Sequence, residues 1–162
     1  MRYVTYFLLF IVAAASACSQ VAMPESQPDG VSNSVYGIGF SCGLASGFGL
    51  SFRHHLPGSF SYQLVGGVIK ADRKTLGNIG GEMQFDFGRT QSTRFFGAAA
   101  LGYFYKGEKE NSLAGPFRAG AGVGIEYQQF RSISIAGELL FTFFNDGDIV
   151  PLPQISMHYY FF

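Results

Sequence analysis

Three side chains near the end of this sequence are of the types that catalyse acyl transfer. Ser156 and His158 lie two residues apart, so an extended strand would place them on one face. A hairpin centred near Gly147 and Asp148 would bring Glu138 beside His158, since facing residues on paired strands approach to about 5 Å. A serine, a histidine and a carboxylate together can activate a nucleophile. The three residues therefore support one interpretation of the protein, an acyl hydrolase.

Two adjacent histidines, His54 and His55, are the other candidates for chemistry. They could ligate a metal ion, but no third ligand follows at the spacing of a metal site. A Leu-Pro-Gly sequence at 56–58 follows them, and this is typical of a turn because proline presets φ and glycine accepts positive φ. We predict a turn here, and we expect no metal and no cofactor.

The composition indicates a single all-β domain. The 162 residues carry 11 basic and 11 acidic side chains, so there is no electrostatic case for binding nucleic acid. The chain has 22 glycines and 17% aromatic residues. Each interior glycine costs a helix about 1 kcal/mol, whereas strands dense in glycine, phenylalanine and tyrosine fit this composition. The glycines alternate within predicted strands and do not precede a helix, so they do not indicate a phosphate-binding loop.

The stretch at 117–127 alternates between apolar and polar positions, and this pattern indicates that β-strands position the polar groups. Its odd positions are Phe, Ala, Ala, Val, Ile and Tyr, and its even positions are Arg, Gly, Gly, Gly and Glu. Strict alternation gives two distinct faces only on a β-strand. A tilted strand that crosses a bilayer needs about 9–11 residues. We predict that the apolar face meets lipid, and that Gly120, Gly122 and Gly124 leave room inside for long side chains from opposite strands.

Turn signals recur along residues 35–162 and divide them into eight strands. We predict an all-β fold, an eight-stranded antiparallel up-and-down transmembrane β-barrel. The connections predicted after the third, fifth and seventh strands are longer and more polar than the others, as in membrane barrels with short periplasmic turns and longer external loops. The predicted strands are 35–42, 47–54, 60–70, 79–87, 95–105, 117–127, 133–143 and 154–162.

The first 34 residues have the features of an export signal and a linker. Residues 1–17 combine Arg2, a short apolar core and a small-residue cleavage site, which is typical of a secretory signal peptide. Cys18 follows at once, and residues 14–18 resemble a bacterial lipobox, so Cys18 is a candidate for lipidation; ordinary cleavage with an incidental cysteine is the open alternative. Residues 18–34 are polar, with proline and glycine, and we predict a flexible leader before a barrel at 35–162.

Full charges lie among the polar members of the alternating strands. They suit a wet, mutually paired interior better than an apolar ligand cup, and aromatic residues gather near the strand ends as in an interfacial girdle. Buried charges must pair, so we expect a lumen network, with at least one carboxyl holding a proton or contacting water. The predicted network comprises Arg53, Glu82, Asp86, Arg118, Glu126 and Glu138.

The chain ends on Tyr-Tyr-Phe-Phe at 159–162, which resembles the C-terminal assembly signal of bacterial outer-membrane proteins. Residues 35–162 as a whole resemble the small OmpA-type and OmpX-type barrel families and the uncharacterised outer-membrane β-barrel domain family, through 37–41, 47–55 and 151–155. The resemblance implies a monomer in the bacterial outer membrane, with outer-membrane lipid and the barrel assembly machinery as partners. By periodicity Ile155, Met157, Tyr159 and Phe161 should face lipid, one residue out of phase with the usual signal.

These observations favour a structural or surface-recognition role over an enzyme. The segments 70–78, 106–115 and 145–153 would form the outward contact surface. The alternatives are a lipid-modifying outer-membrane hydrolase, a narrow channel and a soluble lipocalin-like binder. Small outer-membrane lipid A deacylases carry such a catalytic set, but theirs faces lipid and has the histidine before the serine. Cys42 should point outward at the outer end of the first strand, away from Cys18, without a disulfide between them.

Overall fold

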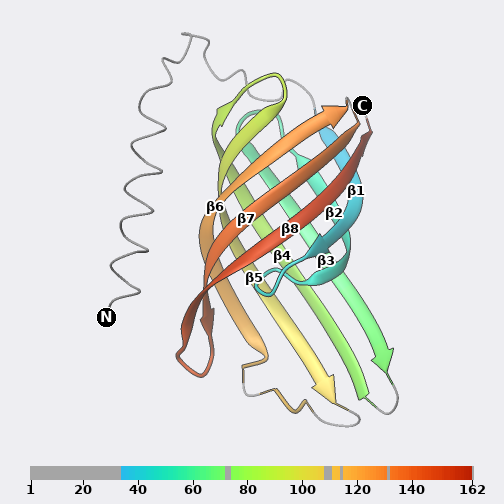
Figure 1. Ribbon diagram of the computed structural model, residues 1–162, viewed down its shortest axis with the longest axis vertical. Helices are drawn as coiled ribbons and strands as arrows, with labels where there is room; N and C mark the ends of the chain where they lie inside the picture. The colour runs from blue at the N-terminus through green and yellow to red at the C-terminus, as the bar shows by residue number, and fades with distance from the viewer. Residues whose placement is uncertain (1–33, 72–73, 108–110, 114, 131, 162) are drawn as a thin grey trace.

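The computed structural model describes residues 34–71, 74–107, 111–113, 115–130 and 132–161, and all of its regular structure is β-strand. Each strand pairs antiparallel with the next, and β8 pairs with β1 to close the barrel (Figure 1). The predicted eight-stranded up-and-down barrel is confirmed. The predicted signal peptide, Cys18 and nearly all of the leader lie outside the described residues. The strands are β1 Val35–Cys42, β2 Phe48–His55, β3 Phe60–Ala71, β4 Lys74–Arg89, β5 Thr93–Gly107, β6 Phe117–Phe130, β7 Ile133–Phe144 and β8 Ile149–Phe161.

Side-chain alternation sorts apolar residues to the outer face of the barrel. On β6, Phe117, Val123 and Ile125 are exposed, while Glu126 between Ile125 and Tyr127 is buried. On β8, Ile155, Met157, Tyr159 and Phe161 are all exposed, as the periodicity predicted, and the residues between them are buried. No helix among the described residues is long and apolar enough to cross a membrane.

Strand β8 begins five residues earlier than predicted, because two prolines that indicated a loop lie inside it. The Tyr160 amide donates to Ser132 on the β7 side, so by alternation the amides of odd-numbered residues in β8 point toward β1. Pairing with β1 ends at Cys42 and Ile155, so Pro151 and Pro153 lie where no β1 residue needs a donor. Proline is tolerated on such an edge.

Other strands are also longer than predicted, and the loops between them are correspondingly shorter. Strand β4 begins at Lys74, so most of the segment 70–78, predicted as an outward loop, is a paired hairpin, with Lys70 opposite Thr75. Strand β6 continues past its predicted end at Tyr127 to Phe130, with a register shift between Gln128 and Phe130. Hydrophobic alternation underestimates strand length here because polar residues also pair in the ladder.

The hairpin of β1 and β2 is much shorter than its neighbours. Pairing of β2 with β3 ends at Leu50 and Gly66, although β3 continues to Ala71. On the other side, β8 residues before Ile155 have no partner in β1. Figure 1 shows this hairpin turning back part-way along the barrel while β3, β4 and β5 continue. We call the place where residues 68–71 and 149–153 lack this neighbour the wall gap.

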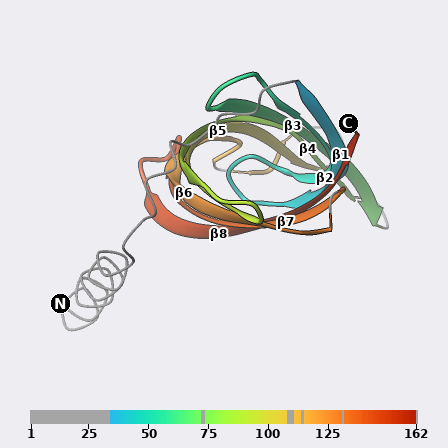
Figure 2. The ribbon, with the colours of Figure 1, turned by 90° about the horizontal axis from the view of Figure 1, so that it is seen from above.

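The connection between β1 and β2, residues 43–47, folds into the lumen (Figure 2). Ala45 and Ser46 within it are completely buried. A Cβ atom built on Gly80 would meet the Ser46 carbonyl, one on Gly102 would meet the Ala45 carbonyl, and one on Gly120 would lie 3.1 Å from the Ala45 Cβ. Inner-face glycines on β4, β5 and β6 thus make room for backbone. The sequence predicted that Gly120 makes room for long side chains from opposite strands, and this is wrong. The space beside Gly120 holds the β1–β2 connection, because the hairpin is too short to line the wall.

Candidate functional site

The predicted catalytic set is not assembled. In the β7–β8 hairpin, Glu138 lies opposite Gln154, and His158 lies opposite Ser134. The turn is centred two residues earlier than predicted, because the proline-containing segment belongs to β8 and lengthens the ladder. The Ser156 hydroxyl accepts a hydrogen bond from Arg53 at 3.1 Å, and the His158 ring contacts Ser51 at 2.8 Å. Ser156 and His158 are therefore committed to other partners, and the structure does not support the hydrolase alternative.

A charge network centred on Arg53 fills the middle of the lumen. Arg53 is completely buried, and its guanidinium lies 3.2 Å from the Glu126 carboxylate and 3.7 Å from that of Glu138. It also donates to Gln63 on the adjacent strand. Inward positions on strands β2, β3, β6 and β7 supply these groups, so the network ties together opposite walls of the barrel.

Arg94 is a second buried cation, and the sequence interpretation missed it. Its guanidinium lies 2.8 Å from Glu126 and 3.1 Å from Asp86, and it stacks over the Phe96 ring. Arg94 shares parity with the buried Phe96, so extending the predicted strand by one residue would have placed it inside. Asp86 also forms an ion pair with Arg89 at 2.8 Å. The register shift after Asp86 lets the side chains of Asp86 and Arg89 lie on the same side of β4.

Gln154 connects the charge network to the buried β1–β2 connection. Its amide nitrogen donates to Glu82 and Glu138, at 3.1 Å in each case. Its amide oxygen accepts from the Ser46 amide and the Ser46 hydroxyl at 3.0 Å, and from the Ala45 amide at 3.3 Å. The orientation of this one side chain is therefore determined from both ends. No signal in the sequence marks Gln154, since its role depends on the connection folding inward.

Arg118 does not join the other five predicted network residues. It lies opposite Phe144, near the β7–β8 turn, and one of its terminal nitrogens donates to the Leu44 carbonyl at 2.8 Å. Its guanidinium stacks over the rings of Phe104 and Phe144, with centroid distances of 4.0 and 4.9 Å. No carboxylate of the described residues forms an ion pair with it. The glycine-rich face of β6 separates Arg118 from Glu126, so one strand serves two different environments.

His54 and His55 lie in β2 and have separate structural roles. His54 stacks on Tyr36 at 4.3 Å and contacts the Tyr62 hydroxyl at 3.1 Å. His55 faces the lumen, where it contacts the Tyr160 hydroxyl at 2.7 Å. Among the described residues, no group of three His, Cys, Asp or Glu side chains could hold a metal ion. Cys42 is exposed and free.

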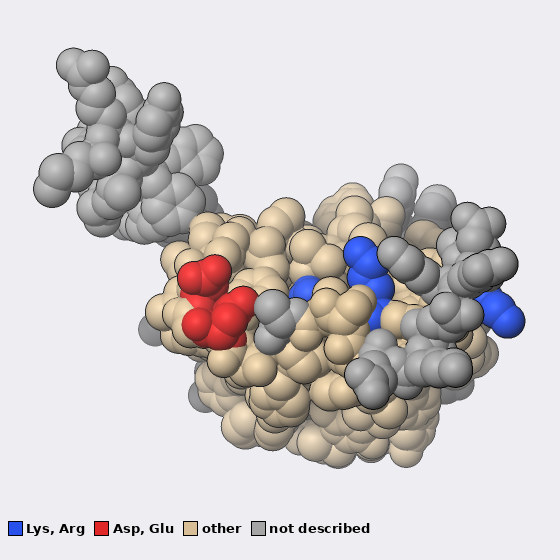
Figure 3. All heavy atoms as spheres, turned by 90° about the horizontal axis from the view of Figure 1, so that it is seen from below, with Lys and Arg blue, Asp and Glu red and all other residues tan. Residues whose placement is uncertain are grey.

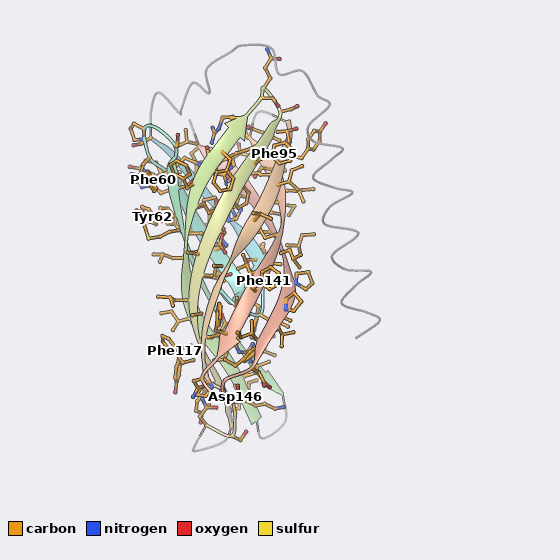
Figure 4. The ribbon with its side chains drawn as sticks, turned by 90° about the vertical axis from the view of Figure 1, so that its left-hand side faces the viewer. Phe60, Tyr62, Phe95, Phe117, Phe141 and Asp146 are labelled. Carbon is orange, nitrogen blue, oxygen red and sulfur yellow. The ribbon has the colours of Figure 1, made fainter. Side chains whose placement is uncertain are left out.

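Aromatic side chains gather on the outer surface toward both ends of the barrel. Figure 4 shows Phe60, Tyr62 and Phe95 toward one end of the barrel, and Phe117 toward the other end, where Asp146 also lies. Exposed aromatic belts above and below an apolar band are typical of barrels that span a bilayer. This surface, the inward charges and the closed strand order together point to a membrane.

Comparison with solved structures agrees with this geometry. The N-terminal β-barrel domain of Pseudomonas aeruginosa OprF superposes with a TM-score of 0.54 at 16% identity, covering 80% of this chain and 98% of that domain. The chain has the fold of a small outer-membrane β-barrel. E. coli outer membrane protein W matches at a TM-score of 0.46 and 16% identity, over 82% of this chain and 99% of that one. A de novo designed transmembrane β-barrel matches at 0.44 and 10% identity, over 85% and 100%.

No protein-family model matches the sequence, and no curated protein matches it. At 16% identity the likeness to OprF establishes the fold alone. The function must therefore be argued from the interior of the barrel and from the end that carries the β7–β8 turn.

Proposed function

We propose that this protein is a closed, non-conducting barrel of the bacterial outer membrane that presents its loop-bearing end for surface recognition. The observation that carries this proposal is the blocked lumen: a buried charge network occupies its middle, and residues 43–47 lie across it. An eight-stranded barrel is just wide enough for side chains to fill it. Such a filled interior suits a structural role. A channel would require the charge network and residues 43–47 to move out of the lumen.

The end of the barrel seen in Figure 3 offers the surface for recognition. Acidic side chains gather on one side of this end, and basic side chains lie apart from them. The β7–β8 turn supplies the exposed Asp146 and Asp148, while the exposed Lys70 and Lys106 lie in β3 and β5. This separation of charge gives a partner a defined orientation. At the opposite end, the aromatic C-terminal strand suits recognition by the barrel assembly machinery during insertion.

Planar-bilayer recording tests the closed lumen. We expect the purified full-length barrel to insert without steady ion conductance, because Arg53 and the β1–β2 connection block the path. The Arg53→Ala variant in the same bilayer is a control, since it removes the central cation but keeps the connection. A stable open conductance from the unaltered protein would overturn the proposal in favour of the narrow channel.

A further inference from the structure

We infer that the outer part of the barrel is a binding site for a single-chain amphipathic anion, in which Arg118 holds the head group and the chain leaves through the wall gap. Arg118, the apolar residues around it and the missing neighbour strand carry this inference. It goes beyond recognition at the loops, because it assigns a ligand class to the inner face of the barrel. It rests on the proposed function only through the closed floor beneath the site.

Two inward-facing apolar side chains in this part of the barrel are exposed, unlike those deeper in the lumen. Ile69 has the parity of the buried Gln63 and Val65 on β3, yet 53% of its surface is accessible. Val150 has the parity of the buried Gln154 on β8 and is 39% accessible. These two residues border the wall gap from opposite sides. Apolar groups exposed together on a concave wall are typical of a ligand site.

The β1–β2 connection forms the floor of this region. Leu44 lies in the connection with 50% of its surface accessible, whereas Ala45 and Ser46 beside it are fully buried. Asn78 fastens the far end of the connection, accepting from the Phe48 amide at 2.9 Å and donating to the Phe48 carbonyl at 2.9 Å. The floor is therefore anchored, and a ligand above it would meet Leu44.

The wall gap opens where the outer face of the barrel is apolar. Phe40 and Leu50 are exposed near the end of the short hairpin, and Val68 is exposed on the bordering strand. Ile155 is exposed on the other border. A hydrocarbon chain crossing the gap would thus pass from the apolar interior of the site to apolar surface facing lipid, without desolvating a charge.

Arg118 supplies the cation for the head group. One of its terminal nitrogens donates to the Leu44 carbonyl, and Phe104 and Phe144 hold the guanidinium plane between them. The remaining donors of the fork form none of the described ion pairs, although Asp146 attracts the guanidinium from a longer distance. A guanidinium outside any close ion pair binds carboxylate or phosphate oxygens well. Arg118 also follows Phe117, whose exposed ring lies in the outer aromatic belt, at the level where anionic head groups lie.

Photo-crosslinking in phosphatidylcholine nanodiscs tests this site. The probe is palmitate carrying a diazirine in its chain, and mass spectrometry maps the attached residues on the full-length barrel. We expect labelling at Leu44, Ile69 and Val150, with competition by unlabelled palmitate or hexadecyl phosphate and not by hexadecanol. The better of the two anions identifies the head group, a carboxylate or a phosphate.

Two variants and a matched control separate the head group from the chain. Arg118→Gln should weaken labelling about tenfold or more, since a charged hydrogen bond is lost, while the glutamine amide can still donate to the Leu44 carbonyl. Ile69→Ser should weaken it about threefold through lost apolar contact. The control is Lys70→Gln, which removes the exposed cation next to Ile69 in the sequence and should leave the labelling unchanged. Each variant is first shown to fold by its heat-modifiable mobility in electrophoresis.

Labelling confined to outward residues such as Val68 and Ile155 would overturn the inference, and so would labelling that Arg118→Gln leaves unchanged or that hexadecanol blocks as well as palmitate. None of these results affects the proposed closed barrel, which fails only if the unaltered protein conducts.

Discussion

At the scale of single residues, Glu126 is the carboxylate on which the interior depends. It lies within 3.2 Å of Arg53 and 2.8 Å of Arg94, and it accepts a hydrogen bond from Tyr160 at 2.7 Å. Glu82 forms no ion pair among the described residues and accepts from the amides of Gln84 and Gln154. Of these two buried carboxylates, Glu126 is therefore the counter-charge of two guanidiniums, whereas Glu82 serves as a hydrogen-bond acceptor.

Neutralising Glu126 should destabilise the barrel far more than neutralising Glu82. In Glu126→Gln two buried guanidiniums lose their shared counter-charge, and removing one partner of a buried ion pair costs about 3–5 kcal/mol. Glu82→Gln breaks none of the described ion pairs; it changes hydrogen bonds, relieves repulsion between Glu82 and Glu138 and weakens a longer-range attraction to Arg53, at about 1 kcal/mol in total. The measurement is the free energy of urea unfolding of the barrel in phospholipid vesicles. Equal losses for the two variants would contradict the assignment of Glu126 as the bridging group.

At the scale of elements, the short β1–β2 hairpin and its buried connection distinguish this barrel from a simple ring of equal strands. Gly80, Gly102 and Gly120 lie on three successive strands, and the connection contacts all three. Their lack of a side chain is thus a packing requirement, because any Cβ at Gly80 or Gly102 would occupy the same space as connection backbone.

Gly102→Val should expel the β1–β2 connection from the lumen. The valine side chain would overlap the Ala45 carbonyl, so the connection must leave or the strand must shift. We test this with Ser46→Cys in a background lacking Cys18 and Cys42, measuring the rate of labelling by a water-soluble maleimide. The rate should rise at least about tenfold with Gly102→Val, since the residue is otherwise completely buried. Gly137→Ala, where nothing lies within 4 Å of the added carbon, is the control and should leave the rate unchanged.

The wall gap makes a second prediction, about proline tolerance along β8. Ile155→Pro would remove an amide that points toward β1 where Cys42 still pairs, and should cost about 3 kcal/mol or prevent folding. Pro151→Val lies beyond the end of β1 and should stay within about 0.5 kcal/mol of the unaltered barrel. Urea unfolding in vesicles measures both. If Ile155→Pro proved harmless, the assigned amide directions in β8 would be wrong.

At the scale of the whole molecule, the up-and-down strand order gathers the turns at the two ends of the barrel, apart from the β1–β2 connection, which lies inside it. The start of β1 lies beside the end of β8, with Tyr36 opposite Phe161, so these two meet at one end. The β7–β8 turn with Asp146 and Asp148 lies at the other end. In the proposed function this second end faces the outside of the cell.

Labelling of intact cells tests that orientation. In a background lacking Cys18 and Cys42, Asp148→Cys should react with a membrane-impermeant maleimide, because it lies in the exposed β7–β8 turn. Gln91→Cys, exposed in the β4–β5 connection at the opposite end, should react only after the outer membrane is opened. The reverse pattern would show that the barrel is inserted the other way, and labelling of neither cysteine after lysis would exclude exposure of both turns.

The sequence by itself determined which face of each strand is apolar. Alternation is a local property, so Phe117 and Glu126 could be assigned to opposite faces without knowledge of their neighbours, and repeated alternation with turn signals predicted a closed barrel of eight strands. The same local rule failed at strand ends. Alternation did not extend the strand to Arg94, and Pro151 and Pro153 predicted a loop where β8 continues.

Only the tertiary structure decided which inward residues meet. The β7–β8 register separates Glu138 from His158, and the shortness of the β1–β2 hairpin sends its connection across the lumen to Gln154. Both outcomes depend on where a neighbouring strand stops, which contacts between distant residues determine. The connection then divides the lumen, so that Arg53 belongs to a buried network while Arg118, with the same chemistry and the same inward direction, remains open to a ligand.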